Sequence, residues 1–384
     1  MDKPAFASRA VHGCQGHDPH TGALSFPIYQ TSTYVNAEDD WPYCYSRVQN
    51  PTREELEKTV ALLEEGDYGF AFASGLAAVL AVFSLTKAGD HVLISDDVYG
   101  GTYRLIEQIW RRYNIDFTYV DMGDLDAVKA AFRPETVMVF IETPTNPMMK
   151  VADIAAVSAL AGEAASRPLV VVDNTFLTPY YQRPLTLGAD IVLHSATKFL
   201  AGHHDTTAGL IVTKGDALAE SMRLFLKTEG TGLAPFDSWL TLRGIKTLPL
   251  RMDKHQANAV AAAEFLQNHP KVEKVYFVGL PEHPGYAVSQ KQASGFGGML
   301  SFSLKSSAGA EKVLRGGDMI LFAESLGGVE TLITYPMTQT HASIPKDVRD
   351  KMGITDRLLR LSVGIEDTGD ILRDLEKMLA LAGD

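Results

Sequence analysis

The sequence predicts an α/β fold, in which helices cover both faces of a mostly parallel sheet, followed by a smaller α+β domain. Between about residues 53 and 213, short apolar segments rich in β-branched residues alternate with helical segments, which is the pattern of βαβ units. Beyond residue 249, strand-like and helical segments follow each other without that regular alternation. The chain has 384 residues, enough for two domains that each bury a hydrophobic core.

The elements of the first domain can be assigned in order along the chain. Residues 53–65 place apolar side chains at the spacing of one helix face, and residues 125–132 and 152–165 supply helices between strands. The strand segments are short and apolar, which is typical of strands buried on both faces. We expect strands at residues 91–95, 116–121, 136–142, 168–173, 190–195 and 208–213.

Pro249 interrupts the long helical stretch 236–269 and should end or kink a helix there. We therefore predict domains at residues 46–249 and 250–384. Residues 1–45 are rich in Gly, Pro, Thr and Tyr, and we expect an extended arm that lies on a neighbouring subunit, because such a segment cannot build its own core. The second domain should contain strands near 272–279, 297–304 and 358–366 and a helix at 371–382.

Composition excludes several classes of partner. The formal net charge of -12 disfavours nucleic acid and anionic lipid. Cys14 and Cys44 form neither a CxxC pair nor a disulfide framework, which indicates a reducing compartment. The first residues lack the apolar core of a signal peptide, and no apolar run approaches the ~20 residues that span a bilayer. We expect a soluble, cytoplasmic protein.

A single lysine, Lys198, follows an apolar strand in the segment LHSATKFLAGHHDTTAG (193–209). A buried charged amine is costly, so its position needs an explanation. One explanation is a metal or anion site built from His203, His204 and Asp205. The other is that the lysine holds a cofactor covalently.

Two further loops bear on this choice. In FASGLAAVL (72–80), Gly75 allows close backbone approach, and the helix that follows offers N–H groups to a phosphate. In VVVDNTF, Asp173 stands at the carboxyl end of a strand, where ligands bind in such sheets. Taken alone, the first segment is equally typical of a packing turn and the second of a capping carboxylate.

Together, the three loops describe a pyridoxal phosphate site. The helix start and the hydroxyls of Ser195 and Thr197 would hold the phosphate, and Lys198 would bind the cofactor through an imine bond. An ionised Asp173 would keep the ring nitrogen protonated, so that the ring can accept electrons. The histidine-rich loop matches no zinc motif, so we predict that no metal is bound.

The sequence resembles the Cys/Met metabolism branch of fold-type I pyridoxal phosphate enzymes, which includes cystathionine β-lyases, γ-lyases and γ-synthases. This resemblance implies an aspartate aminotransferase-like fold with a seven-stranded sheet, and a homotetramer of two active dimers. The matching segments are YSRVQNPTREELE (45–57), FASGLAAV, DDVYGGTYR (96–104), IETPTNP (141–147), VVDNTF, HSATKFLAGH (194–203), ESLGGVETLI (324–333) and RLSVGIED (360–367).

The resemblance also implies a role for each matched residue. Lys198 would carry the cofactor and Tyr99 would stack on its ring, while Tyr45 and Arg47 would reach the phosphate of a neighbouring subunit. Arg360 would clamp the substrate α-carboxylate. The predicted catalytic residues are Lys198, Tyr99 and Tyr45; the predicted cofactor-binding residues are Lys198, Asp173, Gly75, Leu76, Tyr99, Asn146, Ser195, Thr197, Tyr45 and Arg47; and the predicted substrate-binding residues are Arg360, Ser325, Asn146, Arg104 and Glu324.

The cues for the reaction conflict. Gly101 stands where methionine γ-lyases carry a cysteine, and Arg104 could meet the distal carboxylate of a substrate such as cystathionine. Glu324 precedes the segment SLGG, which resembles many cystathionine γ-lyases and γ-synthases, whereas residues 334–345 resemble bacterial cystathionine β-lyases. Cys44 replaces an acidic residue common in γ-enzymes. We favour β-elimination of L-cystathionine, with γ-lyase next, and then γ-synthase or O-acylhomoserine sulfhydrylase.

Overall fold

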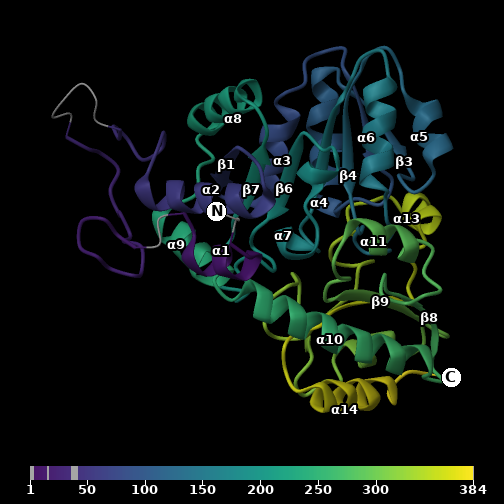
Figure 1. The fold of residues 1–384 in the computed structure, drawn as a ribbon. Coiled ribbons are helices and arrows are strands. Elements are labelled where there is room, and N and C mark those ends of the chain that lie inside the picture. The colour runs from purple at the N-terminus through teal and green to yellow at the C-terminus, as the bar shows by residue number, and fades with distance from the viewer. Residues whose placement is uncertain (1–3, 15–16, 36–41, 384) are drawn as a thin grey trace.

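The computed structural model describes residues 4–14, 17–35 and 42–383. Two bodies are visible, each built on its own sheet: a larger upper one with helices on both faces, and a smaller lower one that holds the C-terminal third of the chain (Figure 1). This arrangement matches the α/β fold with a smaller α+β domain that the sequence predicts.

The larger sheet contains all six predicted strands and one more. Its strands are β1 (Tyr68–Phe72), β2 (His91–Ser95), β3 (Asp116–Val120), β4 (Thr136–Glu142), β5 (Leu169–Asp173), β6 (Ile191–Ser195) and β7 (Gly209–Thr213). Within the described residues they lie in the order β1-β7-β6-β5-β4-β2-β3. Only β7 runs against its neighbours in this part of the chain, so the sheet is mostly parallel. The sequence-based assignment missed β1.

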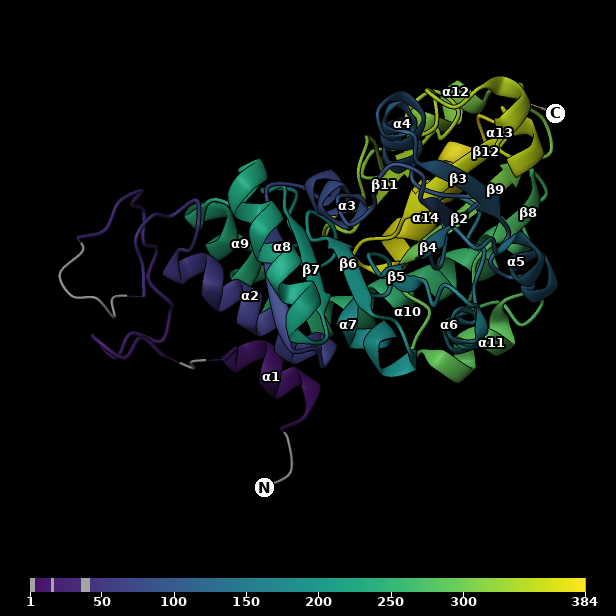
Figure 2. The same cartoon turned by 90° about the horizontal axis from the view of Figure 1, so that it is seen from above.

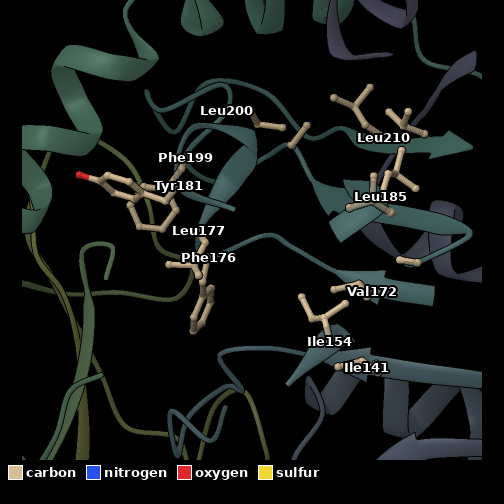
Figure 3. Packing of buried hydrophobic residues seen from close by; sticks show 14 of the residues in the cluster. Ile141, Ile154, Val172, Phe176, Leu177, Tyr181, Leu185, Phe199, Leu200 and Leu210 are labelled. Atoms are coloured by element: carbon tan, nitrogen blue, oxygen red, sulfur yellow. The ribbon is translucent and has the colours of Figure 1, made fainter. Parts of the chain in front are cut away.

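Helices cover both faces of this sheet (Figure 2). One face packs against α3 (Gly75–Phe83), α4 (Gly100–Gln108) and α8 (Asp216–Glu229), and the other against α2 (Pro51–Glu64), α5 (Leu125–Ala131), α6 (Ile154–Glu163) and α7 (Thr178–Tyr181). Successive side chains of a strand point to opposite faces. In β6, Leu193 therefore joins the α3 side, while Val192 joins the α2 side, part of which Figure 3 shows.

The smaller body has a mixed sheet covered by long helices. In the described residues its strands lie in the order β10-β11-β12-β9-β8, and α10 and α14 pack their apolar side chains on it. The elements of the smaller body are β8 (Val272–Tyr276), β9 (Met299–Leu304), β10 (Leu321–Phe322), β11 (Leu332–Thr334), β12 (Leu358–Ser362), α10 (Leu248–Gln267), α11 (Tyr286–Gln292), α12 (Ala310–Leu314), α13 (Lys346–Met352) and α14 (Thr368–Leu379). The larger body also contains α9 (Pro235–Ile245), which packs on α2, and the 3-10 helices η1 (Trp110–Tyr113) and η2 (Pro184–Leu187).

Pro249 lies in the first turn of α10, where its missing N–H leaves no helix hydrogen bond unmade. The helical stretch therefore breaks just before Pro249, between α9 and α10. The domain boundary there stays a prediction.

The N-terminal arm is not extended throughout, because it includes α1 (Phe6–His12), which lies against α2. Its contact with a neighbouring subunit stays a prediction. Among the described residues, none of the helices has the length and apolar character needed to cross a membrane.

Candidate active site

A pocket of about 370 Å³ opens at the carboxyl ends of the central strands. Glu142, Asp173 and Ser195 are the last residues of β4, β5 and β6, and Glu142 pairs in register with Asp173. Ligands bind at this edge in open α/β sheets. The lining residues are Ser74, Gly75, Leu76, Val79, Tyr99, Thr102, Glu142, Pro144, Asn146, Asp173, Thr175, Phe176, Leu193, Ser195, Thr197, Lys198, Thr207, Glu324, Ser325, Leu326, Thr340 and Arg360.

The start of α3 forms one end of the pocket. Ser74 caps the helix by accepting a hydrogen bond from the N–H of Ala77 (3.1 Å). A Cβ at Gly75 would lie 2.8 Å from the Cβ and 2.9 Å from the Oγ of Ser195, so only glycine lets the helix start approach β6 this closely. The first N–H groups of a helix have no partner within it, and together with the Ser195 hydroxyl they form a cradle suited to an anion.

Two carboxyl groups form the floor. Glu142 accepts hydrogen bonds from the N–H groups of Tyr99 (2.9 Å) and Asn146 (3.0 Å) and thereby positions both residues. Burial, reinforced by the neighbouring Asp173, raises the pKa of Glu142 well above its ordinary value. Burial also raises the pKa of Asp173, although the N–H and hydroxyl of Thr175 donate to it and oppose the shift. A cation between these acids would be strongly stabilised.

Lys198 lies in the turn after β6. Its Nζ donates to the Oγ of Ser325 at 2.6 Å. Burial and, to a smaller extent, the charge of nearby Arg360 lower the pKa of Lys198 to about 8, and Glu324 opposes the shift. A substantial fraction of the amine is therefore neutral near pH 8, and a neutral amine is a nucleophile and a base.

Arg360, in the middle of β12, lines the same pocket as the lysine and is only 1% exposed. Its guanidinium donates to the Oδ1 of Asn146 (2.9 Å), the carbonyl of Ser325 (2.8 Å) and the Oγ1 of Thr334 (3.0 Å). Among the described residues, nothing accepts from its buried Nε. Burial lowers the pKa of Arg360 to about 10. These partners are neutral, so the guanidinium is suited to receive a carboxylate.

Comparison with known proteins decides the family. A family model described as "Cys/Met metabolism PLP-dependent enzyme" matches residues 7–380. The chain belongs to this family. Cystathionine beta-lyase of Lactococcus lactis subsp. cremoris MG1363 is 50% identical over 97% of this chain and 98% of that protein. Cystathionine gamma-lyase of Bacillus subtilis 168 is 49% identical over 96% of this chain and 97% of that protein.

The fold of a solved family member is nearly the same. The crystal structure of cystathionine gamma-lyase from Lactobacillus plantarum complexed with L-serine matches with a TM-score of 0.96. It is 46% identical and covers 98% of this chain and 99% of that chain. The likeness confirms the predicted fold-type I architecture.

Pyridoxal phosphate, the cofactor of this family, fits the groups that line the pocket. The cradle at Gly75 suits its phosphate, and the acids at Asp173 and Glu142 suit a protonated ring nitrogen. A partly neutral Lys198 suits its aldehyde. We infer that Gly75, Leu76, Ser195 and Thr197 would hold the phosphate and that Asp173 would face the ring nitrogen.

Most of the predicted site residues lie around this one pocket. Tyr45, Arg47 and Arg104 do not line it. The Arg47 guanidinium lies 5.5 Å from the centre of the Tyr45 ring and donates to the carbonyl of Lys227, and Arg104 is exposed on α4. Their roles stay predictions. The predicted residues that line the pocket are Gly75, Leu76, Tyr99, Asn146, Asp173, Ser195, Thr197, Lys198, Glu324, Ser325 and Arg360.

Sequence reasoning missed Glu142, Thr175 and Thr334. Glu142 ends β4 as Asp173 ends β5, so the rule that found the aspartate could also have found the glutamate. Thr334 is different, because it comes from β11 of the smaller body and no local pattern links it to Arg360.

The histidine-rich loop after Lys198 makes separate contacts. The Nδ1 of His203 lies 2.7 Å from the carbonyl of Ala201, and the Nε2 of His204 lies 3.5 Å from Glu330. In the described ranges, no three His, Cys, Asp or Glu side chains gather where they could hold a metal ion.

Proposed function

We propose that this protein cleaves L-cystathionine by β-elimination, which yields homocysteine, pyruvate and ammonia. The observation that carries the proposal is that a partly neutral Lys198 and a buried Arg360, whose hydrogen-bond partners are neutral, line the same pocket. An amino acid held by its carboxylate at Arg360 would present its α-carbon to the lysine. The same pocket has a floor suited to the family's cofactor.

Each of these side chains would have a defined task. Arg360 would bind the α-carboxylate through its guanidinium, in exchange for its present bonds to Asn146 and Ser325. Lys198 Nζ would take the α-proton, and the Ser325 hydroxyl, at 2.6 Å, would orient the amine for this transfer. Pyridoxal phosphate, when bound, withdraws electrons from the α-carbon.

The choice of β-elimination has specific support. A sulfur on the β-carbon can leave once the α-proton is gone, whereas a sulfur on the γ-carbon requires a second deprotonation at the β-carbon. Residues 334–345 resemble bacterial β-lyases, and they contribute Thr340 to the pocket. Gly101 stands where methionine γ-lyases carry a cysteine, which argues against that activity, and a Cβ at position 101 would lie 2.4 Å from a ring carbon of Tyr99.

Cystathionine γ-lyase is the second candidate. Glu324, which is shared with γ-enzymes by resemblance, lines the rim of the pocket and is exposed to a ligand. The L. plantarum and B. subtilis relatives also carry the γ-lyase name.

Product analysis separates the two reactions. Purified protein with bound cofactor is incubated with L-cystathionine, and the keto acid and thiol are identified by mass spectrometry. We expect pyruvate and homocysteine, whereas 2-oxobutyrate and cysteine would replace the proposal by γ-elimination. Lys198→Ala, assayed in parallel, controls for contaminating activity and should give neither pair.

We also propose that the active form is a homotetramer of two dimers, in which Tyr45 and Arg47 reach the neighbouring pocket. Both side chains are exposed, and neither contributes to the pocket of its own chain. The arm also exposes Leu24 (81%) and Val35 (79%), which a partner subunit would cover.

A further inference from the structure

A buried arginine from the smaller body holds the turn that follows Lys198. Arg251, in the first turn of α10, is 4% exposed. Its Nη1 donates to the carbonyl of Phe199 at 2.6 Å, and its Nη2 lies 3.3 Å from the carbonyl of Leu200. These are the two residues directly after the lysine, and Figure 3 shows both side chains in the core. The guanidinium thus contacts the backbone on which Lys198 is mounted.

The other contacts of Arg251 anchor it to the end of α9. Its Nη2 also donates to the carbonyl of Gly244 (2.8 Å) and its Nε to the Oγ1 of Thr247 (3.1 Å). All of these acceptors are neutral oxygens, and burial lowers the pKa of Arg251 to about 10. Removing the guanidinium would leave buried carbonyls without this donor and so lower stability, and a test of a further role therefore needs a measurement that a loss of stability does not change.

Two glycines make room for this arrangement. Gly202 has φ +76°, and a Cβ there would lie 2.1 Å from the Nη1 of Arg251. A Cβ at Gly244 would lie 2.2 Å from the carbonyl oxygen of Ala201. The turn 196–202, the arginine and the end of α9 therefore fit together only with glycine at both positions.

One helical turn further along α10, His255 contacts the residue that directly follows β12. Its Nδ1 lies 2.6 Å from the carbonyl of Val363, and its ring meets Phe199 edge-on at 5.1 Å. Burial lowers the pKa of His255 to about 4, so the ring is neutral at pH 7 and donates from Nδ1. Val363 follows Arg360 by three residues, so α10 contacts the backbone near both Lys198 and Arg360.

We propose that Arg251 is a positioning residue that fixes the turn 196–202 and so aims the Nζ of Lys198 at the aldehyde of pyridoxal phosphate. Attachment is a condensation in which the amine nitrogen bonds to the aldehyde carbon and water leaves. Arg251 acts through the backbone, because its hydrogen bonds go to carbonyls of the turn and not to Nζ. This role rests on Lys198 being the attachment residue, but not on which carbon–sulfur bond is cleaved.

The test separates cofactor docking from covalent attachment. Apo-proteins of the wild type, Arg251→Lys and Arg251→Met are mixed with pyridoxal phosphate. Docking is measured by fluorescence quenching at early times, and attachment by the growth of its absorbance band. Borohydride reduction and peptide mass then locate the bond. We expect unchanged docking but attachment slowed about a hundredfold in Arg251→Met, since a misplacement of ~1 Å can cost that much, with partial rescue in Arg251→Lys.

A matched control distinguishes positioning from general loss of stability. Asp374→Asn removes a buried carboxylate that accepts from the N–H groups of Asp318, Met319 and Ile320 on the far side of the smaller body. It should lower the apo-protein's Tm yet attach the cofactor at the wild-type rate.

Three results would overturn the role of Arg251. They are a wild-type attachment rate in Arg251→Met, equal slowing in Asp374→Asn, and loss of docking in proportion to attachment. If Arg251→Met does not fold, the test uses Arg251→Lys, because a wild-type attachment rate in that variant would also contradict the role of Arg251. If the wild-type protein carries no cofactor on Lys198, the proposed function fails together with this role. If the wild type gives the expected products and the Arg251 variants attach the cofactor at the wild-type rate, only the role of Arg251 fails.

Discussion

Two walls of the pocket, the acidic floor described above and the side that holds Arg360, contain ionisable groups of opposite type, and burial disfavours the charged form of both. On the side of the large sheet, burial raises the pKa of Glu142 and Asp173 and so disfavours their negative forms. On the side of the smaller body, burial lowers the pKa of Arg360 to about 10 and so disfavours its positive form. A ligand with a cation at one end and a carboxylate at the other would stabilise the charged forms of the groups on both walls. A protonated cofactor ring joined to an amino acid has this distribution of charge.

The walls also differ in how they are built. The acids end parallel strands, so the sheet itself sets their spacing. The opposite wall depends on the loop before Leu326, where Ser325 has φ +84°. A non-glycine residue in that region costs on the order of 1–3 kcal/mol, and such strain is concentrated at functional sites. Lys198 follows β6 of the larger sheet, and its Nζ donates a hydrogen bond to Ser325 on the strained side.

The largest expected effect comes from removing the group between the walls. Lys198→Ala should lose the absorbance band of attached cofactor and reduce turnover on the order of 10²- to 10⁴-fold, because the base is gone while both walls remain. Steady-state assays and spectra check this. Arg251→Lys, which keeps Lys198, should show the absorbance band of attached cofactor once attachment has reached equilibrium. A Lys198→Ala protein with a normal band and rate would remove the lysine from its role.

The next effect tests the cationic wall alone. Arg360→Ala should lower kcat/KM roughly 30- to 4,000-fold, because it removes a desolvated carboxylate contact that contributes about 2–5 kcal/mol of binding free energy. Attachment of the cofactor should persist. Arg357→Ala is the matched control, because Arg357 forms a half-exposed pair with Glu273 (2.6 Å), a type of contact worth ~0–1 kcal/mol. Equal kinetic losses in the two variants would contradict the assignment.

The difference between the walls also explains what could be predicted from the sequence. Asp173 and Lys198 follow recognisable strands, and Gly75 opens a helix, so local patterns and the topology of α/β sheets were enough to bring them together. Arg360 and Ser325 could be assigned only through resemblance, because their place depends on how the second sheet docks. Strand β1 was missed since its sequence, YGFAF, has none of the β-branched residues that mark the other strands, and its strand partner in the described residues, β7, lies far along the chain.

A third prediction asks whether the pocket is complete within one chain. Arg47→Ala should weaken cofactor affinity by about 1.5–3 kcal/mol, roughly 10- to 150-fold, if its guanidinium bonds a phosphate across a subunit interface. Within its own chain, the Arg47 guanidinium stands over the Tyr45 ring and donates a hydrogen bond to the carbonyl of Lys227. Equilibrium dialysis of the cofactor, with sedimentation to verify the assembly, measures this. Unchanged affinity in an intact oligomer would show that the walls of one chain suffice.

A fourth prediction concerns the pH at which Lys198 becomes reactive. Its pKa in the folded chain, about 8, lies below the ordinary 10.5, so the amine loses its proton as pH rises through 8. Only the neutral amine attacks an aldehyde, so the rate of attachment to apo-protein should rise about tenfold per pH unit below 8 and level off above it. Stopped-flow absorbance from pH 6 to 10 gives this profile.

Two residues of the cationic wall should move that profile in opposite directions. The charge of Arg360 lowers the pKa of Lys198 and that of Glu324 raises it. Arg360→Ala should therefore shift the midpoint to higher pH, and Glu324→Gln to lower pH. Burial, the largest cause, remains in both variants, so each shift should be smaller than the displacement from 10.5 to about 8. Shifts of the same sign would mean that the two substitutions change solvent access to the lysine, and that the charges of this wall do not set its reactivity.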